Sequence, residues 1–192
     1  MSSLPSRDKQ SLLELARRSL TLAVQGRESG QPLSSLPENE IRPQAAGAFV
    51  TLRHRGRLRG CIGQLSTNIS LAQIVAHCAK SAALEDPRFD PVHPEELDEI
   101  EIELSVLSPP ENVTVEQIEI GKHGLLVSRG WERGVLLPQV AEQFHWSAQR
   151  FLEETCAKAG FEKDAWQDPA TRIQAFTAEV FSESDFRSTP AR

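Results

Sequence analysis

The 192-residue chain carries a formal net charge of −6, with 39% apolar and 25% charged residues. This composition is typical of a soluble globular domain, and the length is sufficient to bury a core without disulfides. The acidic total disfavours nucleic-acid binding, because such proteins usually present a basic surface. No apolar run reaches the roughly 20 residues that span a bilayer, so we expect neither a nucleic acid nor a membrane as a partner.

The three cysteines, Cys61, Cys78 and Cys156, are an odd number at wide spacing, which does not resemble a disulfide framework. A reducing compartment is the simpler interpretation, and the polar N-terminus MSSLPSRDKQ is no signal peptide, so we expect a cytoplasmic protein. Cys78 and Cys156 fall in register with apolar residues of predicted helices and are expected to be core thiols. The chain has no C-x-x-C, H-E-x-x-H or Walker A motif, so we expect no metal site and no cofactor.

The first third of the chain predicts a helix followed by a hairpin. Apolar residues recur at helical spacing over 11–24, with a possible earlier start at Ser6. Residues 30–47 hold three prolines and no periodicity, which predicts a long surface connection. Residues 48–53 and 58–63 have strand composition and flank a short turn, so a hairpin is expected there.

The middle of the chain predicts a helix and a half-buried strand. Residues 70–84 form an amphipathic pattern with Ser70 as its N-cap. The following EDPRFDPVHPEEL contains three prolines and predicts a stiff loop. In EIEIELSVL, residues 99–107, apolar and polar side chains alternate, as in an antiparallel strand with one face buried.

The last third predicts a second hairpin, two helices and a strand. HGLLVSR and RGVLLP flank the letters GWE, and Pro138 suits the first position of a helix. Ser147 is the expected cap of a further helix that ends at Gly160, and residues 171–181 predict a final strand. Because the strands come mostly in antiparallel pairs, the predicted fold class is α+β.

The segment LRGCIG, residues 58–63, is the most unusual stretch. Strict strand alternation places Leu58 and Ile62 in the core and turns Arg59 and Cys61 together toward the opposite face. A guanidinium beside a thiol favours the thiolate, which suits a nucleophile or a ligand-binding pair. The alternative is a buried, inert Cys61 and a solvated Arg59.

The glycines of this segment and four further residues complete the candidate site. Gly60 and Gly63 would allow a ligand or another backbone to approach closely. Asp86 and Arg88 lie in the stiff loop, where they either tie down a helix end or deliver polar groups to a ligand. Two candidate proton carriers are Glu103, a solvent-face carboxylate by default, and His123, by default a turn residue.

Taken together, the ordered segments GAFVTL, LRGCIG, DPRF, IEIELSVLSPPE, GKHGLLV and RGVLLPQVA resemble the AMMECR domain family over residues 10–182. The resemblance implies a two-lobed α+β fold whose larger lobe carries both termini and an antiparallel sheet. We expect the larger lobe over 1–110 and 166–192, and the smaller lobe, with its own short sheet, over 111–165. The resemblance also implies that LRGCIG lines a cleft between the lobes.

The resemblance supplies no reaction but suggests partners. Bacterial members are called AmmeMemoRadiSam system protein A, which implies association with a Memo-like protein, similar to metal-dependent dioxygenases, and with a radical SAM enzyme. This chain lacks the C-x-x-x-C-x-x-C cluster of a radical SAM enzyme and would be the third component.

Two functions are compatible with these observations. In the first, the cleft binds a ligand or partner without chemistry, through Arg59, Gly60, Gly63, Asp86 and Arg88. In the alternative, the cleft is an enzyme site with Cys61 as nucleophile, Arg59 as anion clamp, and Glu103 or His123 as proton carriers. No spacing places a histidine beside Cys61, which favours the first hypothesis.

Overall fold

The computed structural model describes residues 3–27, 45–65 and 69–186. Most of the expected surface connection over 30–47 therefore lies outside the described residues. The chain divides into two compact units, Met1–Val106 with Glu179–Arg192 (unit 1) and Leu107–Ala178 (unit 2). The smaller lobe is predicted over 111–165, whereas unit 2 covers Leu107–Ala178 and is therefore longer at both ends.

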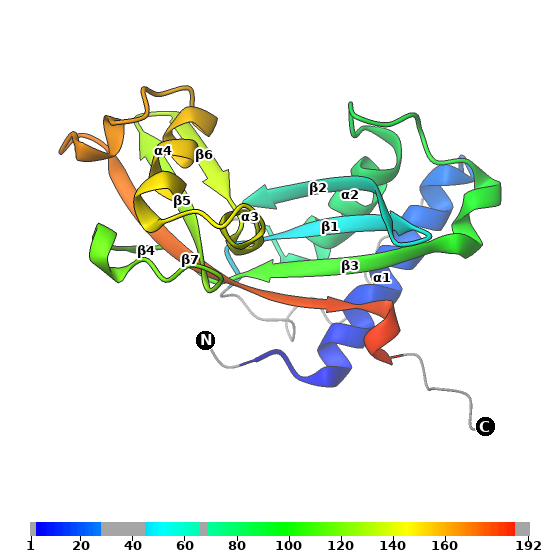
Figure 1. The fold of residues 1–192 in the computed structure, drawn as a ribbon. Coiled ribbons are helices and arrows are strands. Elements are labelled where there is room, and N and C mark those ends of the chain that lie inside the picture. The colour runs from blue at the N-terminus through cyan, green and yellow to red at the C-terminus, as the bar shows by residue number, and fades with distance from the viewer. Residues whose placement is uncertain (1–2, 28–44, 66–68, 187–192) are drawn as a thin grey trace. The chain divides into compact units, whose positions relative to one another are not determined.

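Unit 1 is built from two long helices and a sheet (Figure 1). The hydrogen-bonded strand order begins β2-β1-β3-β7, so β2 is an edge strand. A 3-10 helix precedes β3, and another follows β7. The elements are α1 (Ser6–Val24), β1 (Gly47–His54), β2 (Arg57–Leu65), α2 (Leu71–Leu84), η1 (Pro94–Glu99), β3 (Ile100–Leu107), the end of β7 (Arg172–Ser182) and η4 (Glu183–Phe186).

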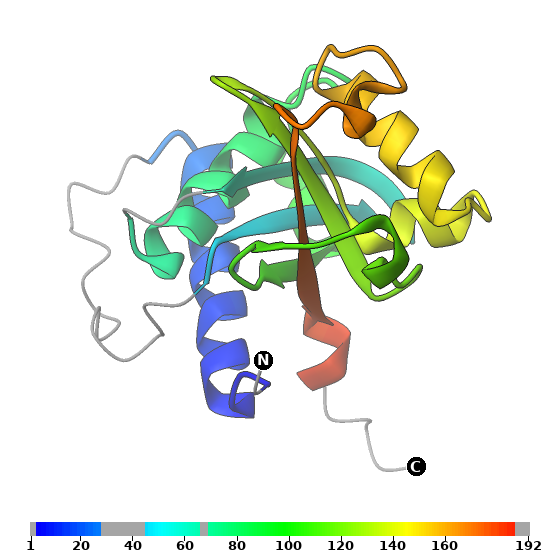
Figure 2. The same ribbon diagram turned by 90° about the vertical axis from the view of Figure 1, so that its left-hand side faces the viewer.

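The core of unit 1 lies between the two helices and one face of the sheet. Helix α2 packs against β1 and β2, and α1 lies beside α2 (Figure 2). Alternate side chains of β1 and β3 are fully buried in this cluster, among them Val50, Leu52, Ile102 and Leu104. The expected alternation of burial is thus confirmed over the first four residues of β3, whereas its last four residues are all buried.

The opposite face of the same sheet carries polar side chains. Thr51 and Arg53 alternate with the core residues of β1, Glu103 and Ser105 alternate with those of β3, and Cys61 pairs in register with Thr51. We call the face with these five residues the polar face of unit 1. These side chains lie outside the hydrophobic core of unit 1, and Thr51 and Ser105 among them are nevertheless buried.

The β1–β2 hairpin is formed as expected, with Arg55 and Gly56 in its turn. Both have positive φ, 52° and 77°, as a two-residue type I′ turn requires. Ile62 packs against the core, as predicted, but the prediction that Leu58 is buried is wrong, because its side chain is 40% exposed.

A β-bulge explains the exposure of Leu58. Leu52 pairs with Gly60, whereas the next residue, Arg53, pairs with Leu58, so Arg59 is an extra residue on β2. A bulge shifts the alternation of the bulged strand by one position. Leu58 therefore shares the face of Arg53 instead of the core face of Leu52.

Gly60 on β2 lies directly against the backbone of α2. A Cβ atom built there would lie 2.1 Å from the carbonyl oxygen of Ala82 on α2. That neighbour is helix backbone, which cannot turn aside as a side chain could. The glycine of LRGCIG at this position is therefore required by packing.

Unit 2 contains a small antiparallel sheet and two helices. In this sheet β5 pairs with both β6 and β7, and the short β4 pairs with β7. The elements are β4 (Glu111–Asn112), η2 (Val115–Gln117), β5 (His123–Arg129), β6 (Glu132–Leu136), α3 (Pro138–Gln143), α4 (Ala148–Lys158), η3 (Ala165–Gln167) and the first part of β7. Its core is a separate cluster that includes Leu125, Val127 and Phe151.

Local helix signals are confirmed in both units. The Ser70 side chain accepts a hydrogen bond from the Gln73 amide, and Ser147 accepts one from the Arg150 amide. Pro138 is the first residue of α3, and Gly160 follows α4 with φ +81°. Within the described residues, no helix has both the length and the apolarity needed to cross a bilayer.

Cys78 and Cys156 are fully buried free thiols, as predicted. Burial raises the pKa of Cys78 to about 11 and also raises the pKa of Cys156. Both side chains thus behave as small core hydrophobes.

Candidate functional site

Seven of the eight residues proposed from the sequence belong to unit 1. Cys61, Arg59, Gly60 and Gly63 lie on β2, Asp86 and Arg88 follow α2, and Glu103 is on β3, whereas His123 begins β5 in unit 2. In unit 2, the Glu119 amide donates to Nδ1 of His123 at 3.1 Å, which closes the turn before the strand. His123 thus fits the default interpretation of a turn residue.

The main chain of Cys61 is bonded to the loop that follows α2. The Cys61 amide donates to Oδ2 of Asp86 at 2.8 Å, and Nη2 of Arg88 donates to the Cys61 carbonyl at 3.2 Å. Because β2 is an edge strand, these two backbone groups have no neighbouring strand on that side. The side chains of Asp86 and Arg88 make the two hydrogen bonds to Cys61 that a neighbouring strand would otherwise make.

Asp86 and Arg88 also bind each other tightly. Oδ1 of Asp86 accepts from the Arg88 amide and Nε at 3.1 and 2.9 Å, and Oδ2 accepts from Nη2 at 2.7 Å. The Asp86 side chain is only 2% exposed. Hydrogen bonds from the Arg88 guanidinium, aided by the Cys61 amide, hold the Asp86 pKa well below its usual range despite burial.

The thiol of Cys61 is half-buried and accepts a hydrogen bond from Oγ1 of Thr51 at 3.3 Å. Arg88 is the guanidinium beside this residue. Its pKa is raised mainly by hydrogen bonds to Asp86 and further by its interaction with Cys61. Thr51 and Arg88 are thus the polar groups next to the sulfur, and the sequence analysis assigned no role to Thr51.

Arg59, the expected partner of Cys61, is engaged elsewhere. Its Nε and Nη2 donate to the two carboxylate oxygens of Glu96 at 2.8 and 2.9 Å. Nη1 and Nη2 also donate to the carbonyls of Asp90 and Pro91 at 2.8 and 3.2 Å. The side chain is 15% exposed, so Arg59 anchors the loop to β2. Its role as an anion clamp stays a prediction.

Glu103 lies beside Arg53 on the polar face, with Oε2 3.5 Å from Nε. A neighbouring hollow of about 300 Å³ is lined by Arg53, Arg55, Gly56, Asp98, Glu99, Ile100 and Glu101. We call it the hairpin hollow. Sequence reasoning missed it, although three arginines at alternate positions near the hairpin turn, 53, 55 and 57, were a visible signal.

Protonation of Asp86 should lower the free energy of unfolding as the pH falls through the acidic range. Its folded pKa lies below the unfolded value of about 3.9, so its contribution is fully present above pH 4 or so and is lost as the pH falls toward the folded pKa. We expect Asp86→Asn to lower the free energy of unfolding by about 1–3 kcal/mol at neutral pH and to reduce the further loss below about pH 4. Urea unfolding at both pH values measures this.

Asp98→Asn is the matched control, because Asp98 is exposed and forms no ion pair with a described residue. It should unfold like the wild type at each pH. An Asp86→Asn variant with wild-type stability at neutral pH would contradict the assigned role.

Arg59 and Glu96 should be energetically coupled. The Arg59 guanidinium lowers the Glu96 pKa to about 2, and the pair is mostly shielded from water. Arg59→Gln and Glu96→Gln should each cost about 1–2 kcal/mol in the free energy of unfolding, and the double variant less than their sum. Chemical denaturation of the four proteins gives the coupling energy, with Arg57→Gln as a neutral control. Strictly additive losses would show that the pair is not a structural unit.

Comparison with known proteins agrees with this fold. The AMMECR1 family pattern matches residues 13–181. A protein from Methanothermobacter thermautotrophicus is 44% identical, covering 93% of this chain and 96% of that protein, and one from Aquifex aeolicus is 40% identical, covering 93% and 94%. The crystal structure of an uncharacterized Pyrococcus horikoshii protein matches with a TM-score of 0.78 at 37% identity, covering 90% of each chain. The α+β fold and the expected family are thus confirmed, and the chain belongs to the AMMECR1 family.

Proposed function

We propose that the chain is a binding module whose ligand or partner contacts the polar face of unit 1. The observation that carries this proposal is the set of short polar side chains on one face of three adjacent strands, Ser105 on β3, Thr51 on β1 and Cys61 on β2. Ser105 is 3% exposed and Thr51 is 9% exposed, although both lie on the face opposite the helix-packed core. A sheet face that served only as solvated surface would more commonly carry long charged side chains.

The chemistry of this set of side chains suits a small polar ligand. Hydroxyl groups donate and accept hydrogen bonds, and the Cys61 sulfur adds a polarizable contact. Arg53 and Glu103 supply one charge of each sign on the same face. Sites for small molecules commonly combine a few convergent polar groups in this way.

The proposal keeps three expectations from the sequence. These are the cleft between the lobes, the Memo-like and radical SAM partners, and a cytoplasmic location. The free state of the three cysteines supports a reducing compartment. In this proposal Asp86 and Arg88 contribute to binding indirectly, because they hold β2 in position. Gly60 and Gly63 also contribute indirectly, because their small size allows neighbouring groups to pack closely against β2.

The alternative is an enzyme with Cys61 as nucleophile. It is favoured by the hydrogen bond from the Thr51 hydroxyl to the sulfur and by the neighbouring Arg88 guanidinium. Against it, the Arg59 guanidinium is already bonded to Glu96. Binding without chemistry therefore accounts better for the observed contacts.

A ligand-observed NMR screen of small polar fragments against the full chain tests the proposal. We expect hits that Thr51→Val and Cys61→Ala weaken about tenfold or more, because each removes a polar contact. Arg57→Gln, a change of an exposed residue on the same strand but outside the polar face, should keep them. Hits that are unaffected by both polar-face variants would contradict the proposal, and a hit that wild type converts but Cys61→Ala only binds would favour the enzyme.

A further inference from the structure

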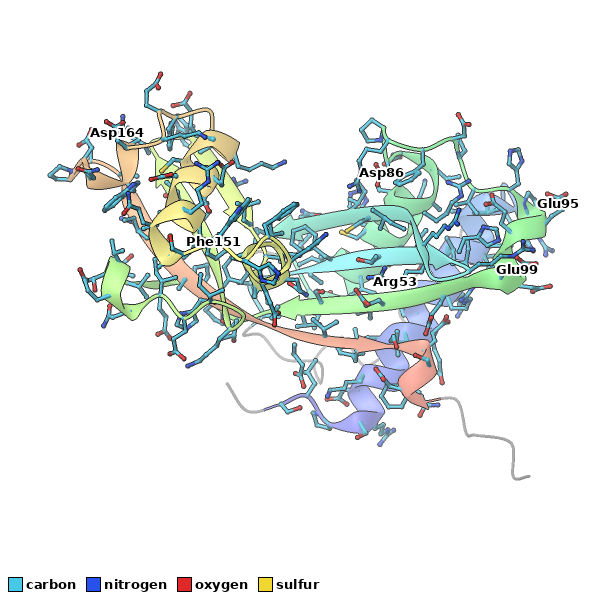
Figure 3. The ribbon with its side chains drawn as sticks, viewed as in Figure 1. Arg53, Asp86, Glu95, Glu99, Phe151 and Asp164 are labelled. Carbon is cyan, nitrogen blue, oxygen red and sulfur yellow. The ribbon has the colours of Figure 1, made fainter. Side chains whose placement is uncertain are left out.

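The hairpin hollow has charged walls of opposite sign. Arg53 and Arg55 come from β1 and the hairpin turn, whereas Asp98, Glu99 and Glu101 come from the end of η1 and the start of β3. Figure 3 shows Arg53 on the sheet and Glu99 where β3 begins. The volume of about 300 Å³ is at the lower end of the range for small-molecule sites.

One positive and one negative side chain of the hollow, Arg55 and Glu99, already bind each other. Arg55 binds the Glu99 carboxylate through both Nε and Nη2, the latter at 2.8 Å, and His54 Nε2 lies 2.8 Å from the same carboxylate. Hydrogen bonds from Arg55 and His54 lower the Glu99 pKa to about 2. The charges of Arg55 and Glu99 therefore compensate each other at the hollow, and these two side chains keep little hydrogen-bonding capacity for a ligand.

Arg53, Asp98 and Glu101 keep hydrogen-bonding capacity. The contact of Arg53 with Glu103, at 3.5 Å, is longer than a usual hydrogen bond, and the arginine side chain is 39% exposed. Glu101 accepts one bond, from the Ser184 amide at 3.3 Å. Asp98 is exposed, and no described residue forms an ion pair with it. The hollow therefore offers one cation and two anions.

We propose that the hairpin hollow binds an α-amino acid with a cationic side chain. Its carboxylate would bind the planar guanidinium of Arg53, which matches a carboxylate in geometry. Its two ammonium groups would bind Asp98 and Glu101. A ligand with one negative and two positive groups matches the unused charges, whereas a polyphosphate would meet an excess of carboxylates.

This site goes beyond the proposed function, because it shares only Arg53 with the polar face and does not include Thr51, Cys61 or Ser105. The two claims can therefore fail separately. Cys61→Ala should leave amino-acid binding in the hollow unchanged, whatever it does to fragment binding.

L-lysine titration of the ¹⁵N-labelled full chain, followed by NMR, tests the inference. Amide signals of residues 53–56 and 98–101 should shift to saturation. Norleucine lacks the side-chain ammonium and cadaverine lacks the carboxylate, so each should bind about tenfold more weakly or worse.

Matched variants identify the groups involved. Arg53→Gln should weaken lysine binding about tenfold but should not weaken cadaverine binding, because only lysine has a carboxylate. Asp98→Asn should weaken both ligands, and Arg57→Gln, an exposed arginine outside the hollow, should weaken neither. Amide spectra that match the wild type away from the hollow confirm folding. Shifts that do not saturate, or equal lysine affinity in Arg53→Gln and Arg57→Gln, would overturn the inference.

Discussion

The hydrogen bonds that Asp86 and Arg88 make to the main chain of Cys61 join the loop after α2 to the edge strand β2, and the candidate site depends on this connection. An edge strand leaves backbone donors and acceptors unpaired, and a buried carboxylate needs donors of its own. Both requirements are satisfied at Asp86. Its buried carboxylate accepts hydrogen bonds from the Cys61 amide of the edge strand and from the Arg88 guanidinium. The segments LRGCIG and DPRF are thus hydrogen-bonded to each other within unit 1.

This constraint accounts for the roles of the neighbouring residues. Gly60 lets β2 approach the backbone of α2, which brings the end of that helix and Asp86 next to the strand. Arg59, displaced by the bulge, binds Glu96 and fixes the far side of the same loop. Most of the charge in LRGCIG and DPRF therefore builds the scaffold, and the side chains left for ligands are those of the polar face and the hairpin hollow.

Features set by neighbours in sequence could be predicted, and those set by distant partners could not. The caps at Ser70 and Ser147 depend on residues three positions away, and the alternation of β3 is visible in its own letters. The bulge at Arg59 depends on the register with β1, so the burial of Leu58 was predicted wrongly. The partners of Cys61 and Arg59, 25 and 37 residues away, leave no local pattern that names them.

Amide hydrogen exchange at Cys61 tests the central interaction most directly. A backbone amide on an edge strand is protected only if something else accepts its hydrogen bond. We predict that the Cys61 amide is protected in the wild type and exchanges about tenfold faster or more in Asp86→Ala, but not in Asp98→Ala. Fast exchange of this amide in the wild type, or equal protection in Asp86→Ala, would contradict the account.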